Sequence, residues 1–276
     1  MRLIADSGSS KTDWVILSES GVEAEFQTAG INPFFRSSTD INAELAPLLS
    51  PYRGKILDMH YYGAGIVNAE KASIVAEAIL PILGEITMEI ESDMLGAARA
   101  LSGDLASIVC ILGTGSNACL YDGKKIVGNI PPMGFILGDE GSGAVLGKQL
   151  IGDYFKQVMP AIVRKMFQEQ YQLESANVID KVYRTERPNK YLAQFARFLN
   201  DFKSEPYCQE LIANQFGAFI DRNILQLPNA KNYTVNFVGS IASHFQQQLK
   251  AQLEIRGLQL GIVLKSPIDG LKVYYL

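Results

Sequence analysis

The feature that most constrains the fold is a pattern that occurs twice in the chain. An apolar strand at residues 3–6 enters a turn of small residues, and a second apolar strand follows at 14–17. The same order of strand, small-residue turn and strand returns at 108–121. In each copy a third strand follows, and helices then alternate with strands. The sequence therefore predicts two β-β-β-α-β-α halves, related by an internal duplication.

The first half is expected to contain one more meander strand, two later strands and three helices. We expect a helix to begin after Asp40, which is a plausible N-cap. The second half carries a long, mainly helical stretch before its last strands. The expected strands are 22–28, 56–62, 86–91, 125–127, 235–238 and 258–264, and the expected helices are 41–49, 69–80, 94–101 and 241–253, with helical residues from 147 to about 227 and a short final segment at 268–275.

Composition narrows the class of protein. The 276 residues are 47% hydrophobic and 20% charged, which is ordinary for a globular chain with a real core. A net charge of −4 argues against nucleic acid or an anionic membrane as a partner. Cys110, Cys119 and Cys208 show no metal-site spacing, and His60 and His244 show none either. No apolar run reaches the ~20 residues of a membrane helix, so we expect a cytoplasmic protein.

The first candidate site follows the first strand, in residues 6–13. The small residues lie between two strands and not before a helix, which excludes a Walker P-loop. Such a hairpin can still direct N–H groups at a phosphate, with hydroxyls from Ser9, Ser10 and Thr12 and the charge of Lys11. Asp6, at the strand end, is placed to hold Mg²⁺. A polar hairpin turn with an Asp cap remains an equal alternative.

Two glycine turns in the second half are further candidates. Residues 113–117 form a turn in which Thr114 is flanked by glycines, so the backbone could approach a ligand closely. Residues 238–242 form a junction from strand to helix, where Gly239 would let an adenine or ribose lie against the backbone. An ordinary turn is the alternative in both places.

Carboxylates mark two more candidates. Asp93 follows the strand at 86–91, at the end of a strand where ligands of open α/β sheets bind, and it could accept a proton from an attacking hydroxyl. The alternative for Asp93 is a helix N-cap. Asp139 and Glu140 lie among the glycines of residues 134–143, before a helix that would begin near Ser142 and present its positive end.

Together, residues 6–12, 113–117, 134–143 and 238–242 resemble the BadF/BadG/BcrA/BcrD ATPase family, in its N-acetylglucosamine kinase-like branch, within the sugar kinase/Hsp70/actin superfamily. The resemblance covers nearly the whole chain. It implies an α/β fold with a duplicated ribonuclease H-like (actin-like ATPase) architecture and two lobes with an interlobe cleft. The lobes would span 1–112 and 113–276, the second with a helical insertion, and the final segment at about 266–276 could pack back on the first.

The resemblance also implies roles for single residues. Asp93 is similar to the catalytic base. The family often has glycine where this chain has Ser7, and the cysteines lack the pattern of the branch that holds an iron–sulfur cluster. The implied ATP and phosphate ligands are Gly8, Ser9, Ser10, Lys11, Thr12, Thr114, Gly115, Gly239 and Ser240, and the implied sugar ligands are Asn32, Ser116, Asn117 and Asp139.

The function implied is an ATP- and Mg²⁺-dependent sugar kinase that phosphorylates a hydroxyl, O6 by expectation. N-acetylglucosamine is the first choice of acceptor, followed by N-acetylmuramic acid, glucosamine and glucose. The expected partner is a small-molecule sugar, without nucleic acid or membrane, and a homodimer is left open. The alternatives are an ATPase that activates or regulates another protein, a sugar sensor without catalysis, and an actin-like polymer.

Overall fold

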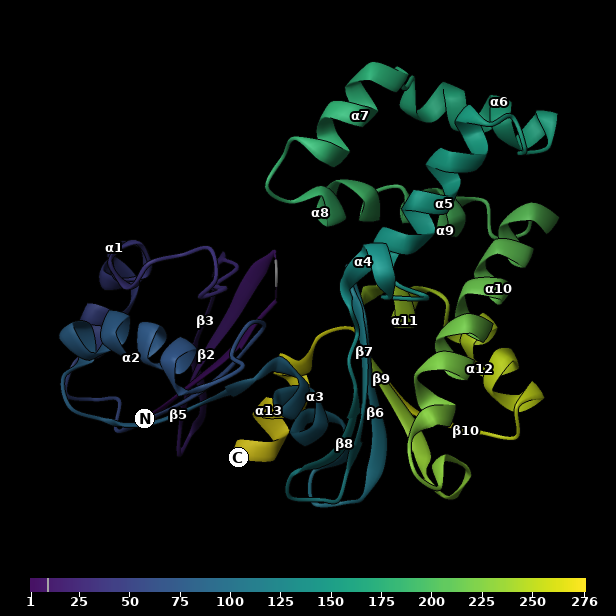
Figure 1. Cartoon of the computed structure of the whole chain (residues 1–276). Helices are drawn as coiled ribbons and strands as arrows, with labels where there is room; N and C mark the ends of the chain where they lie inside the picture. Colours follow the sequence, from purple (N-terminus) through teal and green to yellow (C-terminus); the bar gives the residue numbers. More distant parts are fainter. Residues whose placement is uncertain (9) are drawn as a thin grey trace. The chain divides into compact units, whose positions relative to one another are not determined.

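A computed structural model describes residues 1–8 and 10–276. The chain forms two compact units. The first consists of residues 1–105, 123–125 and 266–276, and the second of residues 106–122 and 126–265. Each unit contains a five-stranded mixed β-sheet with helices (Figure 1). The predicted duplicated α/β fold is therefore confirmed.

The sheet of the first unit has the strand order β3-β2-β1-β4-β5. The first three strands form an antiparallel meander, and β4 and β5 then add in parallel to β1. The parallel strands are connected through helices, as such connections require. The bounds are β1 Arg2–Ser7, β2 Lys11–Ser18, β3 Gly21–Ala29, β4 Asp58–Gly63 and β5 Thr87–Ser92.

The sheet of the second unit repeats this topology, with the order β8-β7-β6-β9-β10. The meander is again antiparallel, and β9 and β10 are again parallel to the first strand of the unit. The bounds are β6 Ser107–Leu112, β7 Ser116–Tyr121, β8 Ile126–Ile130, β9 Thr234–Val238 and β10 Gln259–Leu264.

Helices cover both faces of the first sheet. Alternation along β1 explains how: Leu3 and Ala5 pack with α1 and α2, whereas Ile4 faces the other way and packs with Leu271 of α13. A short 3₁₀ turn follows α1. The bounds are α1 Ser38–Leu49, 3₁₀ turn Ser50–Tyr52, α2 Ala69–Leu83, α3 Asp93–Ser102 and α13 Pro267–Tyr275.

The first helix begins earlier than expected. Its N-cap is Ser37, whose hydroxyl accepts a hydrogen bond from the backbone N–H of Asp40 at 3.2 Å. The prediction of Asp40 as the N-cap was therefore wrong. Asp40 lies three residues after the N-cap, at the position where an acidic side chain of a capping box reaches back to the cap. Its Oδ2 accepts from the Ser37 hydroxyl at 2.6 Å.

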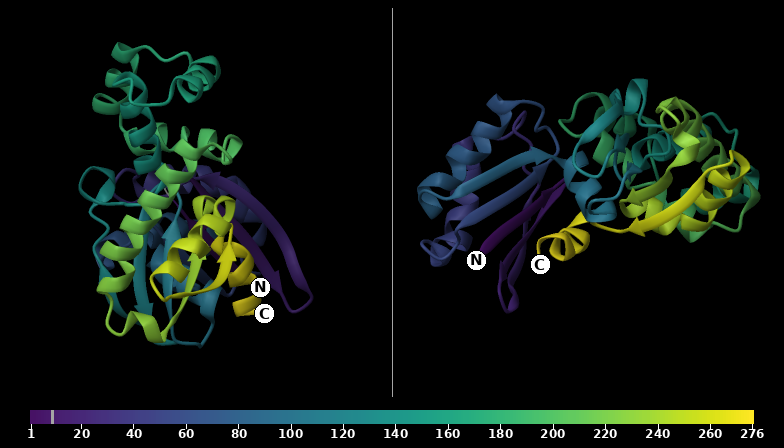
Figure 2. Two further views of the ribbon diagram at one scale, coloured as in Figure 1. Left: turned by 90° about the vertical axis from the view of Figure 1, so that its right-hand side faces the viewer. Right: turned by 90° about the horizontal axis from the view of Figure 1, so that it is seen from below.

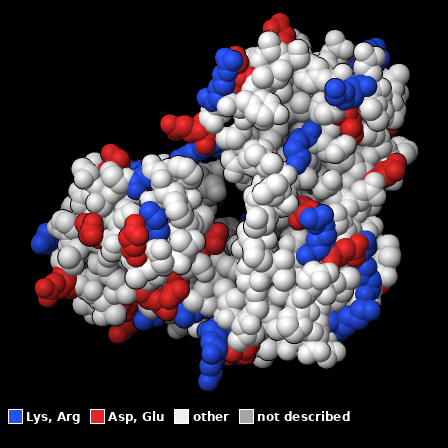
Figure 3. Space-filling model, viewed as in Figure 1, with Lys and Arg blue, Asp and Glu red and all other residues white. Residues whose placement is uncertain are grey.

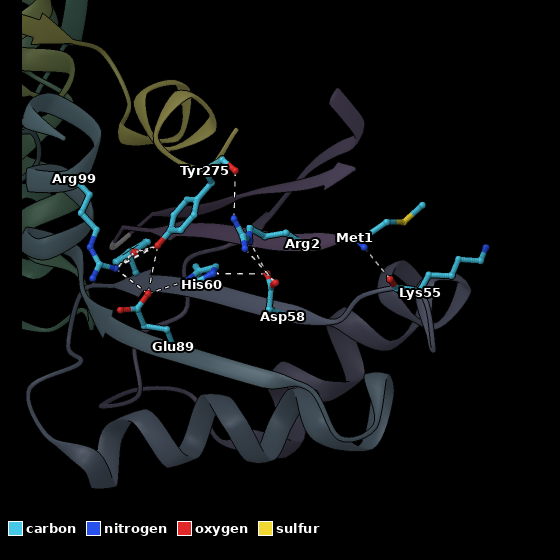
Figure 4. A network of polar contacts seen from close by, with 9 residues as sticks. Met1, Arg2, Lys55, Asp58, His60, Glu89, Arg99 and Tyr275 are labelled. Carbon is cyan, nitrogen blue, oxygen red and sulfur yellow. Dashed lines mark hydrogen bonds and ion pairs between the residues drawn. The ribbon is translucent and has the colours of Figure 1, made fainter. Parts of the chain in front are cut away.

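The final helix, α13, packs against α3 and the first two strands. Gly270 makes this possible, because a Cβ at that position would collide with the carbonyl oxygen of Ala100. Arg2 bonds Asp58 at 2.7 Å and donates to the carbonyl oxygen of Tyr275 at 3.3 Å, so the two ends of the chain lie side by side (Figures 2 and 4).

A polar network extends from this point (Figure 4). The ring of His60 stacks on Tyr275 with 4.2 Å between centroids, and its Nδ1 lies 2.7 Å from Glu89. Arg99 of α3 pairs with the same carboxylate at 2.8 Å. Burial alone would raise the pKa of Glu89, but its contacts with Arg99 and His60 outweigh that influence and lower the pKa to about 2. The network therefore joins α13, α3 and the sheet through hydrogen bonds, ring stacking and the ion pair between Arg99 and Glu89.

The second unit holds a helical stretch between β8 and β9. Its core is a large apolar cluster that joins β6 and β7 to α5, α10 and α12. The predicted helix at 241–253 is two helices, because the chain leaves helical geometry at Phe245. The bounds are α4 Gly134–Leu137, α5 Gly143–Phe155, α6 Ala161–Tyr171, α7 Ser175–Tyr183, α8 Pro188–Ala193, α9 Ala196–Asp201, α10 Pro206–Arg222, 3₁₀ turns Ile224–Gln226 and Ala230–Asn232, α11 Ser240–His244 and α12 Gln246–Ile255.

The surface carries charges of both signs. On the face drawn in Figure 3, basic and acidic side chains are interspersed over both units rather than gathered by sign. Within residues 1–8 and 10–276, no helix combines the length and apolarity that crossing a membrane requires.

Candidate functional site

Two predicted site residues of the first unit, Asp6 and Asp93, lie at the same edge of the sheet. Ser7 pairs with Gly63, and Gly63 pairs with Ser92, so the carboxyl ends of β1, β4 and β5 are level. Asp6 precedes Ser7, and Asp93 directly follows Ser92 as the first residue of α3. The N-cap of α3 is Ser92, whose hydroxyl accepts from the N–H of Leu95, so Asp93 is not the cap.

Burial raises the pKa of both carboxyls, and neighbouring carboxylates raise that of Asp6 further. Removal from water, then the neighbouring Asp93 and Asp13, raise the pKa of Asp6 to about 8, against the opposing charge of Lys11. Burial also raises the pKa of Asp93, while hydrogen bonds from backbone N–H groups at the start of α3 act in the opposite direction. The environment of Asp6 therefore disfavours a bare anion and favours a bound proton or cation.

Asp13 is a third carboxylate at this edge, and no role was predicted for it. It pairs with Asp6 across the hairpin. Its carboxylate is 2.9 Å from Lys11 Nζ and accepts from Gln27 Nε2 at 2.5 Å and from the hydroxyl of Ser266 at 3.3 Å. Asp13 thus has its own cationic and polar partners, and it holds Lys11 beside the turn.

The predicted phosphate ligands of this hairpin differ in their exposure. Gly8 closes the turn by donating to the Lys11 carbonyl at 3.0 Å, and Ser10 and Lys11 are exposed. Ser9 lies outside the described residues. The hydroxyl of Thr12 is fully buried, 2.8 Å from the Ser7 hydroxyl and 3.1 Å from the Ala29 carbonyl, so it points away from any ligand of the turn.

Asn32, the predicted sugar ligand of this unit, lies in the loop after β3. Its Oδ1 accepts from the backbone N–H of Phe34 at 3.0 Å, and its carbonyl accepts from Phe35 and Arg36. The bond to Phe34 fixes Oδ1 of the amide, whose donor group is Nδ2.

The donor set suits a magnesium ion that is held mainly by its substrate. Over residues 1–8 and 10–276, no three His, Cys, Asp or Glu side chains gather as a metal cage. Mg²⁺ is commonly bound by one or two carboxylates together with phosphates and water. Asp6 is a hard oxygen ligand whose ionised form lacks solvation, and a divalent cation would offset that cost. The residues present therefore fit Mg²⁺.

In the second unit, the turn at residues 113–115 is bonded to the start of α5. The N–H of Gly113 donates to the Gly115 carbonyl at 3.0 Å. The N–H groups of Gly143 and Ala144 donate to the carbonyls of Gly113 and Thr114 at 2.8 and 3.1 Å. The first amides of α5 are thus occupied by the turn, so the helix start holds the turn in shape instead of facing a ligand with free N–H groups.

Asp139 lies against this turn. A carboxylate oxygen accepts from the N–H of Ser116 at 3.4 Å, and a Cβ on Gly115 would lie 3.1 Å from the other oxygen. Asp139 is 9% exposed, and burial raises its pKa to about 6. Three predicted residues, Gly115, Ser116 and Asp139, are therefore brought together. The adjacent Glu140 instead pairs with Arg222 at 2.6 Å.

The other two predicted positions of this unit lie on neighbouring elements. Asn117 is the next residue of β7, and its Oδ1 accepts from Asn129 at 3.3 Å. Gly239 has φ +125°, and a Cβ there would collide with the carbonyl oxygen of Leu112. The backbone of the junction between β9 and α11 therefore lies directly against the end of β6, and Ser240 begins α11 at that point.

Comparison with known proteins gives the family. No family model and no curated protein matches the chain. Among solved structures, two similar proteins are described as putative N-acetylglucosamine kinases. The one from Porphyromonas gingivalis is 44% identical, with 100% of this chain and 98% of that chain covered and a TM-score of 0.94. The chain belongs to this family of sugar kinases. The predicted resemblance is confirmed.

More distant structures support the fold of this sugar kinase. The protein from Chromobacterium violaceum is 16% identical, with a TM-score of 0.66 over 100% of this chain and 98% of that chain. A ROK family glucokinase from Streptomyces griseus, solved in complex with glucose and AMPPNP, is 14% identical, with a TM-score of 0.56 over 99% of this chain and 97% of that chain. As a member of the family, the chain is a carbohydrate kinase.

Two residues of the sugar kinase's candidate site were missed, and only one had a signal in the sequence. Counting back along both strands from the small-residue turn pairs Asp6 with Asp13, which would have identified the third carboxylate. The buried hydroxyl of Ser7 bonds Ile31, 24 residues away, and no local pattern indicates that contact.

Proposed function

We propose that this sugar kinase transfers the γ-phosphate of ATP to O6 of N-acetylglucosamine, with Asp93 as the general base. The observation that carries the proposal is the placement of Asp6 and Asp93, two partly buried residues whose carboxyl pKa is raised, at one edge of the first sheet beside the small-residue hairpin. Phosphoryl transfer from a metal-bound nucleotide requires a metal ligand and a base of this kind. The name of the 44% identical protein supports the choice of sugar.

Asp93 is suited to the base because its environment favours proton uptake. Burial raises its pKa above the ordinary value of an aspartate, and a less acidic carboxyl is a stronger base. In the proposed step the O6 oxygen bonds the γ-phosphorus, the bond from that phosphorus to the β,γ-bridging oxygen breaks, and the O6 proton moves to Asp93. Asn32 would orient the acceptor through its Nδ2 donor, since Oδ1 is engaged by Phe34.

The remaining residues would bind the nucleotide and the metal. Asp6 would hold Mg²⁺, whose charge offsets that of the phosphate oxygens. Gly8, Ser10 and Lys11 would contact phosphate from the first hairpin, and Ser9 keeps its predicted role there. In the second unit Thr114 and Gly115 would contact phosphate, Gly239 and Ser240 the adenosine, and Ser116, Asn117 and Asp139 the sugar. For Thr12 the ligand would have to be its backbone, since its hydroxyl is buried.

The test is a panel of sugars incubated with Mg-ATP, with the product identified by mass spectrometry and the phosphorylated carbon by ³¹P-coupled NMR. The panel holds N-acetylglucosamine, N-acetylmuramic acid, glucosamine and glucose. We expect rapid ADP release only with the acceptor, and N-acetylglucosamine 6-phosphate as the product.

Three outcomes would contradict the proposal at different levels. Another phosphorylated sugar would overturn the choice of substrate, and phosphate on a different carbon would overturn O6. ATP hydrolysis that is indifferent to every sugar would favour the alternative of an ATPase that regulates another protein.

A further inference from the structure

The hydroxyl of Ser7 is the centre of a buried hydrogen-bond cluster at the end of β1. Ser7 is fully buried. Its Oγ accepts from the backbone N–H of Ile31 at 3.0 Å, lies 3.1 Å from the Ile31 carbonyl and 2.8 Å from the Thr12 hydroxyl. One side chain thus engages both backbone polar groups of Ile31, the residue before Asn32.

A second hydroxyl supports the same peptide. Tyr61 of β4 donates to the Ile31 carbonyl at 3.1 Å. Burial raises the pKa of this phenol, so that it remains a donor. The carbonyl of Ile31 is therefore fixed by two side chains from neighbouring strands, and its N–H by one. A buried N–H and carbonyl without such partners would be costly, so the cluster determines where this loop crosses the sheet edge.

Asn32 is also held from the other side. Its Oδ1 would lie 2.5 Å from a Cβ at Gly65, so the amide rests directly on the Gly65 backbone, which has φ +86°. Gly65 belongs to the loop after β4. The neighbouring residue Ala64 donates its N–H to the carbonyl of Ser7 at 2.9 Å. The side chain of Ser7 thus holds Ile31, the residue before Asn32. The carbonyl of Ser7 holds the loop that contains Gly65, on which the Asn32 amide packs.

Ser7 also belongs to the hairpin of the candidate site. It directly follows Asp6 and pairs with Thr12 across the turn. Three segments therefore meet at this residue: the phosphate hairpin, the Asn32 loop and the Gly65 loop. A shift of any one of them relative to the others would break at least one bond of Ser7.

We propose that Ser7 is a positioning residue, which sets the place of Asn32 relative to the carboxylates of the site. It would touch neither sugar nor nucleotide, because its hydroxyl is buried and engaged. The inference rests on the proposed function in one respect only, the role of Asn32 as a sugar ligand. The effect of Ser7 on the stability of residues 30–33 can be measured without an activity assay.

The test compares Ser7→Ala with wild type and with Thr28→Val. Thr28 is the matched control, because its hydroxyl also serves a buried partner in this sheet, accepting from Trp14 Nε1 at 2.9 Å, but makes no hydrogen bond to residues 30–33 in the described part of the chain. Losing the Ser7 hydroxyl is expected to raise KM for the sugar by ~10-fold, because one buried hydrogen bond that places the sugar ligand Asn32 is lost. KM for ATP is expected to rise by less than ~2-fold, because Asn32 is not a nucleotide ligand. Thr28→Val is expected to change neither KM.

Hydrogen exchange supplies the second readout. The amide of Ile31 is expected to exchange at least ~10-fold faster in Ser7→Ala than in Thr28→Val, because local opening then breaks fewer bonds. Tyr61→Phe, which removes the second donor to the same carbonyl, provides a further variant. Tyr61→Phe is also expected to raise the sugar KM. In the double variant the two effects should not add, because both hydroxyls bond the same carbonyl.

The outcomes separate the role of Ser7 as a positioning residue from the proposed function. Equal changes in both KM values, or unchanged exchange at Ile31 in folded Ser7→Ala, would overturn the role of Ser7. If Ser7→Ala does not fold, an unchanged sugar KM in Tyr61→Phe would overturn it. If wild type phosphorylates a different sugar, the proposed substrate fails, and the Ser7 comparison is made with that sugar. If wild type phosphorylates none, the proposed function fails and the exchange of Ile31 alone decides.

Discussion

The two sheets have one topology but carry different chemistry at equivalent positions. In the first, the paired residues next to the hairpin end are Asp6 and Asp13; in the second, the corresponding pair is Ile111 and Asn117. The second unit supplies its carboxylate from a loop instead, as Asp139. A shared fold therefore sets where strand ends and turns lie, while the residues placed there decide what each unit does.

The turns differ in the same way. The first hairpin presents Gly8 and exposed polar side chains, whereas in the second unit Gly239 lies directly against the backbone of Leu112 and Gly115 lies against Asp139. The candidate site of the first unit thus consists mainly of charged and polar side chains, whereas that of the second consists mainly of closely packed backbone. This contrast can be tested with substitutions in each unit.

The largest effect is expected for Asp93→Asn. If the first unit supplies the base, this change should lower kcat by at least ~10²-fold, the lower end for acid–base catalysis, and leave ATP binding nearly intact. Steady-state kinetics and nucleotide titration measure both. Glu91→Gln, an exposed carboxylate two residues earlier, is the control and should retain activity. Near-normal turnover of folded Asp93→Asn would remove Asp93 from its role.

Gly239→Ala tests the close backbone of the second unit. The new Cβ would meet the Leu112 carbonyl, and φ +125° is unfavourable for alanine. Strain and overpacking together should reduce the free energy of unfolding by about 2–4 kcal/mol. Gly113→Ala, where a Cβ meets nothing within 4 Å, should cost less than about 1 kcal/mol. Denaturant unfolding compares the two, and equal losses would refute the steric account.

Asp6→Asn tests the charge of the first unit. The magnesium concentration for half-maximal kcat should rise by ~10-fold, since one of the few protein ligands of the ion is lost. Folding should be preserved or improved, because a poorly solvated carboxyl is replaced by a neutral amide. An unchanged magnesium titration would argue against Asp6 as the metal ligand.

The smallest effect is expected for Asp139→Asn, through pH. The folded pKa of Asp139 is raised from 3.8 to about 6, so the folded state binds the proton more tightly than the unfolded state does. This group therefore favours folding below its unfolded pKa, and its contribution is lost as pH rises through about 6. Asp139→Asn should raise Tm at neutral pH, with a smaller gain near pH 4. A gain that is the same at both pH values would contradict the assignment.

Much of the fold followed from the sequence because its signals are local. Apolar runs and small-residue turns gave strands within one to three residues of those observed, such as 86–91 against β5 Thr87–Ser92. The break at Phe245 had no such signal, since no Gly or Pro interrupts the pattern at 241–253. The final segment, left without an assigned type, is helix α13.

The candidate site was less accessible to sequence reasoning, because its details depend on partners distant in the chain. The burial of the Thr12 hydroxyl results from contacts with Ser7 and with Ala29, 17 residues on. The partners of Asp13 include Ser266. Residue types and order indicated which chemistry was present, and only the register and the loops determined which groups are free to perform it.

The placement of α13 has a consequence for biosynthesis. The first unit takes its sheet from the beginning of the chain but one of its covering helices from residues 267–275, which seal Ile4, Val15 and Leu17 on one face. A nascent chain must therefore expose that apolar face until residues 267–275 have been translated. The second unit, whose segments all precede α13 in the chain, can fold before the sheet of the first unit is fully covered.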